Sequence, residues 1–337
     1  MKPQRFFKMF IVGLLLISLF LGASHTLYAD EIDPEEMSVA ILLPGPRDDG
    51  GWSQAAYEGI KYLEEEYGIE GAYSESVDTP DAPEYIRGYA EQGYDWIIGH
   101  SFTFGDPIMD IAPEYQDIKF TVNSSNVTQD PNVSSFDYTP YETGFVAGIV
   151  AGLLTETNQV AMIGGLEIPP IINNLEGFEK GVEYVNPEAE AITLLTGISE
   201  DISQAQETAT SLIEDGVDVL TADADQATYG VIYAAEEHDI YHVGMNRDQN
   251  EVAPDTVVTS ALQNYYVAME YIFKDIIEGD YGPQYYELGY PERAIDLASF
   301  HDFAEELPDE FFEELDTVLK ELEGGEIDLE ELPPHDN

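Results

Sequence analysis

The chain has 337 residues, of which 68 are acidic and only 12 basic, and it contains no cysteine. The lack of cysteine excludes disulfide bonds, thiolate catalysis and cysteine metal sites. The net charge of −56 disfavours nucleic acid, nucleotides and anionic lipids as partners, since all of them would be repelled. With 44% hydrophobic residues the chain can still build a core, so it is not a disordered acidic polymer.

Residues 1–29 have the pattern of a secretory signal peptide. Lys2, Arg5 and Lys8 precede an uncharged apolar run over residues 9–23, and the small residue Ala29 suits cleavage. The alternative is a retained membrane anchor. Cleavage would leave nine basic and 68 acidic residues, a net charge of −59, in a periplasmic or extracellular protein that does not insert into the membrane. Because salt screens such self-repulsion, we expect a high-salt environment.

From residue 39 onward, short apolar runs alternate with segments of helical periodicity. The runs predicted as strands are residues 39–43, 96–99, 119–123, 160–164, 192–196, 217–221, 242–245 and 257–261. Helices are predicted between them, over residues 52–67, 84–92, 143–154, 205–214, 229–237 and 265–277. This alternation predicts an α/β fold with parallel sheets, and the length predicts two lobes. After residue 305 we expect an acidic helix and tail that cap the fold.

Ligands of such sheets bind beyond the carboxyl ends of the strands, so polar and aromatic residues at those points are candidates for a binding site. At the first strand end, Asp49 can cap the next helix or accept a hydrogen bond from a ligand. Trp52 can stack on a flat solute while Gly50 and Gly51 let the backbone approach closely. The alternative for Trp52 is a place in the core.

The loop HSFTFGDP supplies four more candidates, Ser101, Phe102, Phe104 and Asp106. Its two phenylalanines alternate on a polar turn and cannot both face the core, so we expect one of them to provide a second stacking face. Packing alone is the alternative for the pair. Asp106 precedes a proline and is expected to cap a helix whatever else it does.

Polar side chains also follow the later strands. Asn123 ends the strand over residues 119–123, and Asp223 and Asp225 follow the strand VDVLTA. Pro170 and Asn174 stand after IGG, where an asparagine side chain could read the polar edge of a solute because it both donates and accepts. Helix capping is the alternative reading for Asn174 and for the two aspartates.

Six stretches together resemble the basic membrane protein family of exported solute-binding receptors, which serve ABC importers and include purine nucleoside receptors. The stretches, in family order, are GPRDDGGWSQAAYEG, HSFTFGDP, YETGFVAGIVAGLL, IGGLEIPPIINNLEGFEKGVEYVNP, GVDVLTADADQATYGVIYAAEE and VGMNRDQ. The resemblance covers about residues 38 to 300. It implies a small-molecule ligand, an ABC permease and ATPase as partners, and a receptor that we expect to be monomeric and free of cofactors.

The resemblance also implies a type I periplasmic binding protein, with two Rossmann-like lobes joined by three hinge crossovers. These crossovers are expected near Tyr141, Asn250 and Pro283. Lobe one would then comprise residues 38–140 and 251–282, and lobe two residues 141–250 and 283–304. Residues 305–337 would form the acidic C-terminal helix and tail.

One departure from the family concerns the ribose of a nucleoside ligand. Relatives that bind nucleosides carry an aspartate where Asn246 stands and a lysine where Gln263 stands. Here both charges are missing together, which is tolerable because neither is left buried and unpaired. The ribose subsite is therefore in doubt, and a purine base such as adenine and a purine nucleoside both stay open as ligands.

We do not expect an enzyme. The sequence shows no GxSxG elbow, no Walker loop and no HExxH motif. His100 and His301 have no partner in a triad pattern, so a solvent or helix-cap role is expected for each. No metal site is expected either. The rival functions are a sugar or autoinducer receptor of the same fold, or a sensory receptor for a membrane signalling partner.

Overall fold

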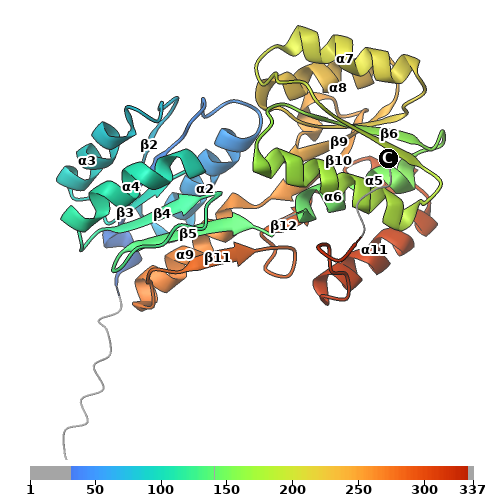
Figure 1. The fold of residues 1–337 in the computed structure, drawn as a ribbon. Coiled ribbons are helices and arrows are strands. Elements are labelled where there is room, and N and C mark those ends of the chain that lie inside the picture. Colours follow the sequence, from blue (N-terminus) through green and yellow to red (C-terminus); the bar gives the residue numbers. More distant parts are fainter. Residues whose placement is uncertain (1–31, 140, 333–337) are drawn as a thin grey trace, which may run out of the picture.

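In a computed structural model that describes residues 32–139 and 141–332, the chain forms two α/β lobes side by side (Figure 1). The expected signal peptide, residues 1–29, lies outside the described residues. Among the residues that are described, no helix combines the length and the apolar composition needed to cross a bilayer.

The first lobe contains a sheet of six parallel strands in the order β11-β5-β4-β3-β1-β2. The strands are β1 (Ser38–Leu42), β2 (Glu70–Ser74), β3 (Trp96–Gly99), β4 (Lys119–Asn123), β5 (Val133–Tyr138) and β11 (Tyr285–Leu288). The helices are α2 (Trp52–Tyr67), α3 (Ala82–Gln92), α4 (Gly105–Ile111) and α9 (Tyr265–Glu278). Because alternate residues of β1 face opposite sides, Val39 and Ile41 pack toward α2 and α9, while Ala40 and Leu42 pack toward α3 and α4.

The second lobe has a sheet in the order β12-β10-β9-β8-β6-β7. Its strands are β6 (Gln159–Gly164), β7 (Glu190–Leu195), β8 (Val219–Asp223), β9 (Tyr241–Asn246), β10 (Val257–Gln263) and β12 (Ile295–Leu297). All neighbours are parallel except β12, which runs antiparallel to β10. The helices are α5 (Glu142–Leu154), α6 (Pro169–Val185), α7 (Ile202–Glu214) and α8 (Thr228–Glu237).

Helix α5 is buried along nearly its whole length, as expected for a helix that is apolar on every side. Gly144 and Gly148 face the backbone of α6, where even a methyl group would overlap with the carbonyls of Asn174 and Phe178. These two glycines therefore bring α6 close to α5 and fix the position of Asn174 at the mouth of the second lobe.

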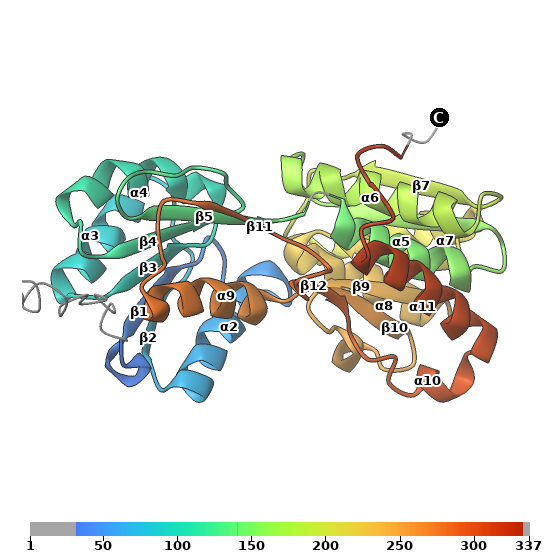
Figure 2. The same cartoon turned by 90° about the horizontal axis from the view of Figure 1, so that it is seen from below.

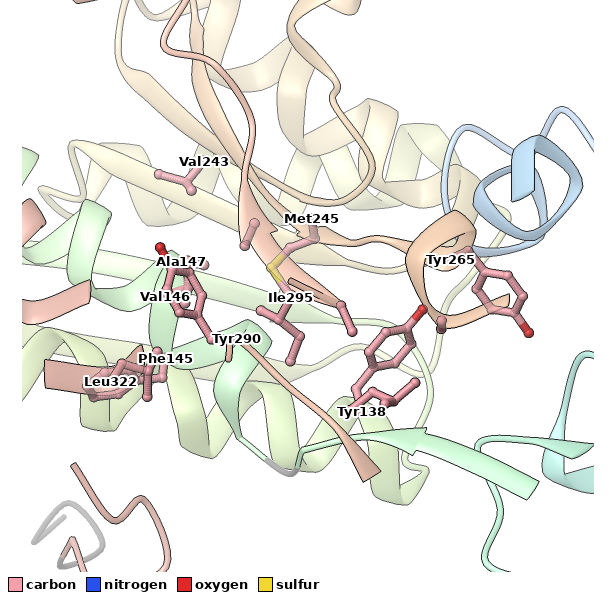
Figure 3. Packing of buried hydrophobic residues seen from close by; sticks show 14 of the residues in the cluster. Tyr138, Phe145, Val146, Ala147, Val243, Met245, Tyr265, Tyr290, Ile295 and Leu322 are labelled. Carbon is pink, nitrogen blue, oxygen red and sulfur yellow. The ribbon is translucent and has the colours of Figure 1, made fainter. Parts of the chain in front are cut away.

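The largest hydrophobic cluster runs through both lobes (Figure 3). In the first lobe it includes Tyr138 and Tyr265, and in the second Met245 and Ile295. The C-terminal helix α11 (Asp309–Glu323) adds four apolar side chains to it, Phe311, Leu315, Val318 and Leu322, after the short helix α10 (Phe303–Glu306). The acidic C-terminal helix thus covers the second lobe with its apolar face.

The predicted α/β fold of two lobes is confirmed, but the second lobe returns to the first at a different residue than expected. The expectation placed residues 251–282 in lobe one, whereas β10 pairs with β9 in the second sheet. The chain crosses back only between Gln263 and Tyr265, and it leaves again after Leu288 rather than near Pro283 (Figure 2). The physical reason is that β10, buried from Val257 to Ala261, completes the hydrophobic interior of the second sheet.

Candidate functional site: a cleft between the lobes

A cleft of about 490 Å³ lies between the lobes and is lined by residues of both. Ten of the expected site residues line it: Asp49, Trp52, Ser101, Phe102, Pro170, Asn174, Asp223, Asp225, Asn246 and Gln263. They come from the carboxyl ends of strands and the turns that follow them, where parallel sheets bind ligands. A smaller pocket of about 150 Å³ adjoins it and shares Phe102, Asn174 and Gln263.

The turn between β1 and α2 is held by Asp49. Its carboxylate accepts hydrogen bonds from the backbone N–H groups of Gly51 (2.9 Å), Ser53 (2.9 Å) and Gln54 (3.0 Å). These donors belong to the helix start, where the first N–H groups have no partner within the helix. Asp49 therefore caps α2, and its buried carboxylate places Trp52 at the edge of the cleft.

Behind Trp52 lies a buried histidine. The rings of Trp52 and His100 are 3.9 Å apart between centroids. The His100 Nε2 atom is 3.1 Å from the Trp52 carbonyl oxygen, and Nδ1 is 2.6 Å from the Tyr265 hydroxyl. Burial lowers the pKa of His100 to about 3, so the imidazole is neutral. The expected solvent or helix-cap role of His100 is wrong: this residue supports one face of Trp52 from the interior.

His301 behaves differently. It lies in a turn before α10, with its Nε2 atom 2.9 Å from a carboxylate oxygen of Asp248. Its side chain stays partly exposed and does not line the cleft. This histidine therefore joins two loops of the second lobe at the surface.

The two phenylalanines of HSFTFGDP have opposite environments. Phe102 is 44% exposed and lines the cleft, whereas Phe104 is 0% exposed and packs in the core between β3 and α4. Ser101 lines the cleft as well, and its hydroxyl accepts a hydrogen bond from the Thr103 N–H at 3.2 Å. Phe102 is therefore the available stacking face, and the expectation for Phe104 is corrected.

Asp106 and Asn123 were also expected to bind the ligand, but neither lines the cleft. Asp106 is exposed in the first turn of α4, outside the cleft, and its side chain makes no capping hydrogen bond. Asn123 is fully buried at the end of β4 and does not line the cleft. Asn123 therefore lies behind the site rather than in it.

In the second lobe, Asp223 organises two amides. Its carboxylate accepts from Asn174 Nδ2 at 2.8 Å and from Asn246 Nδ2 at 3.1 Å. Asn246 adopts a left-handed backbone with φ of +68°, a conformation that asparagine tolerates better than most residues. Burial raises the pKa of Asp223 from its usual value, while the two amides oppose that rise. The three side chains thus form one polar unit at the ends of β8, β9 and the start of α6.

Gln263 ends β10, and its amide nitrogen lies 3.3 Å from the Thr143 hydroxyl. Both residues belong to the second lobe and line the smaller pocket. Pro170, in the first turn of α6, lines both cavities. Gln263 thus places a neutral amide at the end of β10, with a neighbour in its own lobe.

Sequence reasoning missed Asp137 and Tyr138, which line the cleft from the end of β5. That strand, VSSFDY, was not predicted, because two adjacent serines and an aspartate interrupt its apolar pattern. Desolvation raises the pKa of Asp137 to about 6. Desolvation, together with repulsion from Asp223, Asp49 and Glu200, raises the pKa of Asp225 to about 7.

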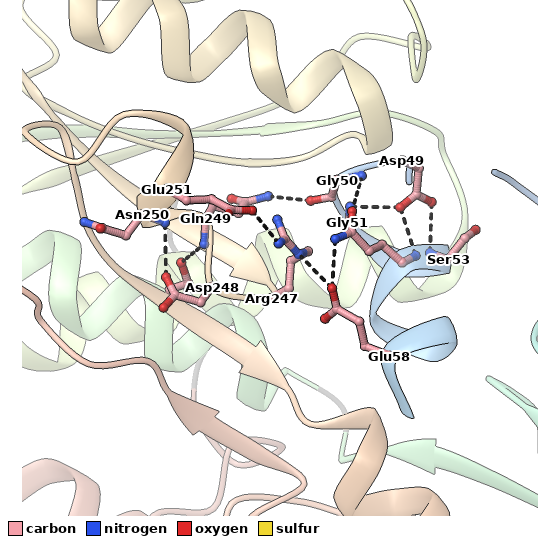
Figure 4. A network of polar contacts seen from close by, with 12 residues as sticks. Asp49, Gly50, Gly51, Ser53, Glu58, Arg247, Asp248, Gln249, Asn250 and Glu251 are labelled. Atoms are coloured by element: carbon pink, nitrogen blue, oxygen red, sulfur yellow. Dashed lines mark hydrogen bonds and ion pairs between the residues drawn. The ribbon is translucent and has the colours of Figure 1, made fainter. Parts of the chain in front are cut away.

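At one side of the cleft the lobes touch (Figure 4). Gln249 Nε2 donates to the Gly50 carbonyl at 3.3 Å, and Arg247 lies 4.0 Å from Glu58. Gly50 has a φ of +76°, and a methyl group added to it would overlap with the ring of Tyr229. Glycine is therefore needed here both for its backbone and for the close approach of the two lobes.

Two α/β lobes with a cleft at their strand ends and three connecting passages define the type I periplasmic binding protein fold. A solved structure of an ABC transporter solute-binding protein from Conexibacter woesei matches with a TM-score of 0.75 and 25% identity, over 88% of this chain and 99% of that one. The family model described as ABC transporter substrate-binding protein PnrA-like matches residues 36–323. The chain belongs to this family, the basic membrane protein family.

Two curated relatives illustrate its range. The transcriptional activator protein med of Bacillus subtilis is 28% identical over 82% of this chain and 84% of its own length. A purine-binding protein of Brucella abortus is 26% identical over 91% of this chain and 84% of its own.

Proposed function

We propose that this protein is the exported receptor of an ABC importer and that it binds a purine base or a purine nucleoside. One observation carries the proposal: Trp52 and the exposed Phe102 line the same cleft as the amides of Asn174 and Asn246. Stacking on an aromatic side chain contributes about 1–3 kcal/mol of binding free energy per base. Amide side chains can form hydrogen bonds with the polar edge of the ring. Family membership and the name of the Brucella relative support the same ligand class.

A nucleoside carries a ribose that needs its own binding pocket, whereas a free base does not. The neutral pair Asn246 and Gln263 favours a base, since these two positions lack the opposite charges that the family resemblance associates with a ribose. The pocket of about 150 Å³ beside the cleft has room for a further group, with the hydroxyls of Thr139 and Thr143 in its wall. Comparing the affinities of adenine and adenosine decides between them.

Binding without catalysis is part of the proposal and is supported by the description of the family as ABC transporter substrate-binding proteins. Two carboxylates of the cleft are held in structural hydrogen bonds within their own lobes. Both oxygens of Asp223 accept from amides, and Asp49 is occupied by helix N–H groups. The implied partners are an ABC permease and its ATPase, and genes for both beside this one would favour import over sensing.

High salt is the third part of the proposal, and it rests on the net charge of −56. At about 1 M salt the Debye length falls to about 3 Å, so repulsion between surface carboxylates is largely screened. The melting temperature should therefore rise steeply between dilute buffer and molar KCl. A melting temperature that does not depend on salt would refute this part alone.

The ligand class is tested by thermal shift in molar KCl against purine bases, nucleosides, sugars and amino acids. We expect purines to raise the melting temperature, because a ligand that binds only the folded state stabilises it by mass action. Stabilisation by glucose or ribose with no effect of adenine, adenosine or guanosine would show that the ligand is a sugar.

A further inference from the structure

The polar lining of the cleft presents acceptors to the ligand. Asp223 can only accept when it is ionised, so the amide nitrogens of Asn174 and Asn246 face its carboxylate. The oxygens of both amides therefore point away from Asp223. Within residues 32–139 and 141–332, neither oxygen is engaged in a hydrogen bond, and both side chains line the cleft.

Two carboxylates add to this set from opposite lobes. Asp225, from the end of β8, forms no side-chain hydrogen bond or ion pair with any described residue. Asp137, from the end of β5, accepts only from the Tyr138 N–H, so one oxygen is left over. No lysine or arginine is found among the described residues that line the cleft. Nothing in the lining therefore neutralises these carboxylates or offers a cationic donor.

A second observation at the same place points to a ligand. Tyr138 is more than nine-tenths buried and lines both the cleft and the adjoining pocket, yet its hydroxyl has no hydrogen-bond partner among the described residues. A buried hydroxyl left without a partner is costly, so such a group generally meets a water or a ligand. The carboxylates are thus part of a formed cavity with aromatic walls.

We propose that this cleft selects purines by their exocyclic amino groups and rejects carbonyl oxygens at the same positions, with Asp225 as the main discriminating residue. The inference rests on the proposed function. An amino group supplies two N–H donors to acceptors that are otherwise unmatched. A carbonyl oxygen would face a carboxylate oxygen, which repels it and leaves both groups desolvated without a bond.

The first experiment is calorimetric titration of the full-length mature protein in molar KCl at pH 8.5. This pH lies above the raised pKa values of Asp225 and Asp137, so both are ionised and can only accept. We expect affinity to rise from purine to adenine to 2,6-diaminopurine, by about tenfold or more for each amino group that reaches a carboxylate. Hypoxanthine should bind at least about tenfold more weakly than adenine.

The second experiment is Asp225→Asn, which keeps the shape of the side chain and tolerates the left-handed backbone (φ +44°) of this residue. An amide can donate to a carbonyl, so the preference for adenine over hypoxanthine should shrink by about tenfold. Asp106→Asn, an exposed aspartate outside the cleft, is the matched control and should leave the preference intact.

The outcomes separate the inference from the proposed function. If purines bind but adenine and hypoxanthine bind equally, the inference is wrong and the proposed function stands. If the adenine preference exists but Asp225→Asn leaves it unchanged, the assignment to Asp225 is overturned. If no purine binds at all, the proposed function is wrong and the inference falls with it.

Discussion

The two lobes contribute different chemistry to the same cleft. In the first lobe the strand ends carry ring faces, Trp52 and Phe102, whereas in the second they carry the amides and carboxylates of Asn174, Asp223 and Asn246. A ring face attracts any flat heterocycle, while hydrogen-bonding groups distinguish one ring edge from another. Under the proposed function, ring stacking comes from the first lobe and most of the hydrogen-bonding groups come from the second, so affinity and selectivity can be tested separately.

The lobes also support their contact residues differently. Trp52 rests on the ring of His100, which is itself held by the Tyr265 hydroxyl. The amides of Asn174 and Asn246 are instead fixed by hydrogen bonds to one carboxylate. Packing fixes the first set of groups and polar bonds fix the second, so mutation and pH should affect the two lobes unequally.

The largest expected effect comes from comparing two phenylalanines of the first lobe, one in the core and one in the cleft. Phe104→Ala should lower the free energy of unfolding by about 3–5 kcal/mol, because it empties a fully buried site. Phe102→Ala should change stability little and weaken purine binding by about 1–3 kcal/mol, since its ring is exposed in the cleft. Urea denaturation and calorimetry measure the two effects. Equal stability losses would contradict the different placement of the rings.

A pH experiment compares one buried histidine in each lobe, His100 and His242. Burial lowers the pKa of each to about 3. The unfolded chain, with a pKa of about 6.5, therefore takes up protons first as pH falls, and stability is full above that pH and lost progressively below it. Between pH 7 and pH 5 each histidine should account for about 2 kcal/mol of lost stability.

His242→Leu isolates this effect in the second lobe, because neither His242 nitrogen has a hydrogen-bond partner among the described residues. The variant should lose about 2 kcal/mol less than the wild type between pH 7 and pH 5, measured by urea denaturation at each pH. Raised carboxylate pKa values, such as that of Asp137, act in the opposite direction but are common to both proteins. An identical pH dependence of wild type and variant would argue against a buried, neutral His242.

Trp52→Ala sharpens the division between the lobes. Binding of purine, adenine and 2,6-diaminopurine should weaken by a similar amount, about 1–3 kcal/mol, because stacking ignores the exocyclic groups. The ratio of the three affinities should therefore stay constant, as measured by titration calorimetry. If Trp52→Ala keeps the affinity for purines but lowers the stability of the fold, Trp52 has a purely structural role.

The smallest effect concerns the place where the lobes touch. Gly50→Ala adds a methyl group that meets Tyr229 where the two lobes touch, so it should hinder closure and weaken ligand binding by about tenfold. Gly93→Ala is a matched control, since Gly93 has a similar φ of +86° but open space around it. Both variants carry the same backbone strain, and only Gly50→Ala should affect affinity. If both or neither weaken binding, contact at Gly50 does not govern closure.

Much of the fold could be predicted because long apolar strands and periodic helices alternate. The strands β2, β5, β11 and β12 were missed because they are short or rich in polar residues, and Asp137 and Tyr138 were missed with β5. The prediction that β10 belongs to lobe one was also wrong. An apolar strand fits either sheet by composition, and only its pairing with β9 decides.

The site residues could be predicted from the sequence wherever the strand that precedes them could be recognised. Asp49, Trp52, Asp223 and Asn246 follow strands that the sequence shows plainly, and all four line the cleft. The choice between Phe102 and Phe104 could not be made, because both lie in one turn of 3₁₀ helix and point to different sides. Which ring faces the core depends on packing in a cluster with residues such as Leu42 and Ile86, which are far from this loop in the sequence.

The most direct test of the account is a crystal structure of the protein with adenine, grown in molar salt. We predict that the purine ring lies in the cleft against Trp52 and Phe102 of the first lobe, with its amino group directed at carboxylate and amide oxygens of the second. Adenine bound away from those rings, or an empty cleft at saturating adenine, would contradict it.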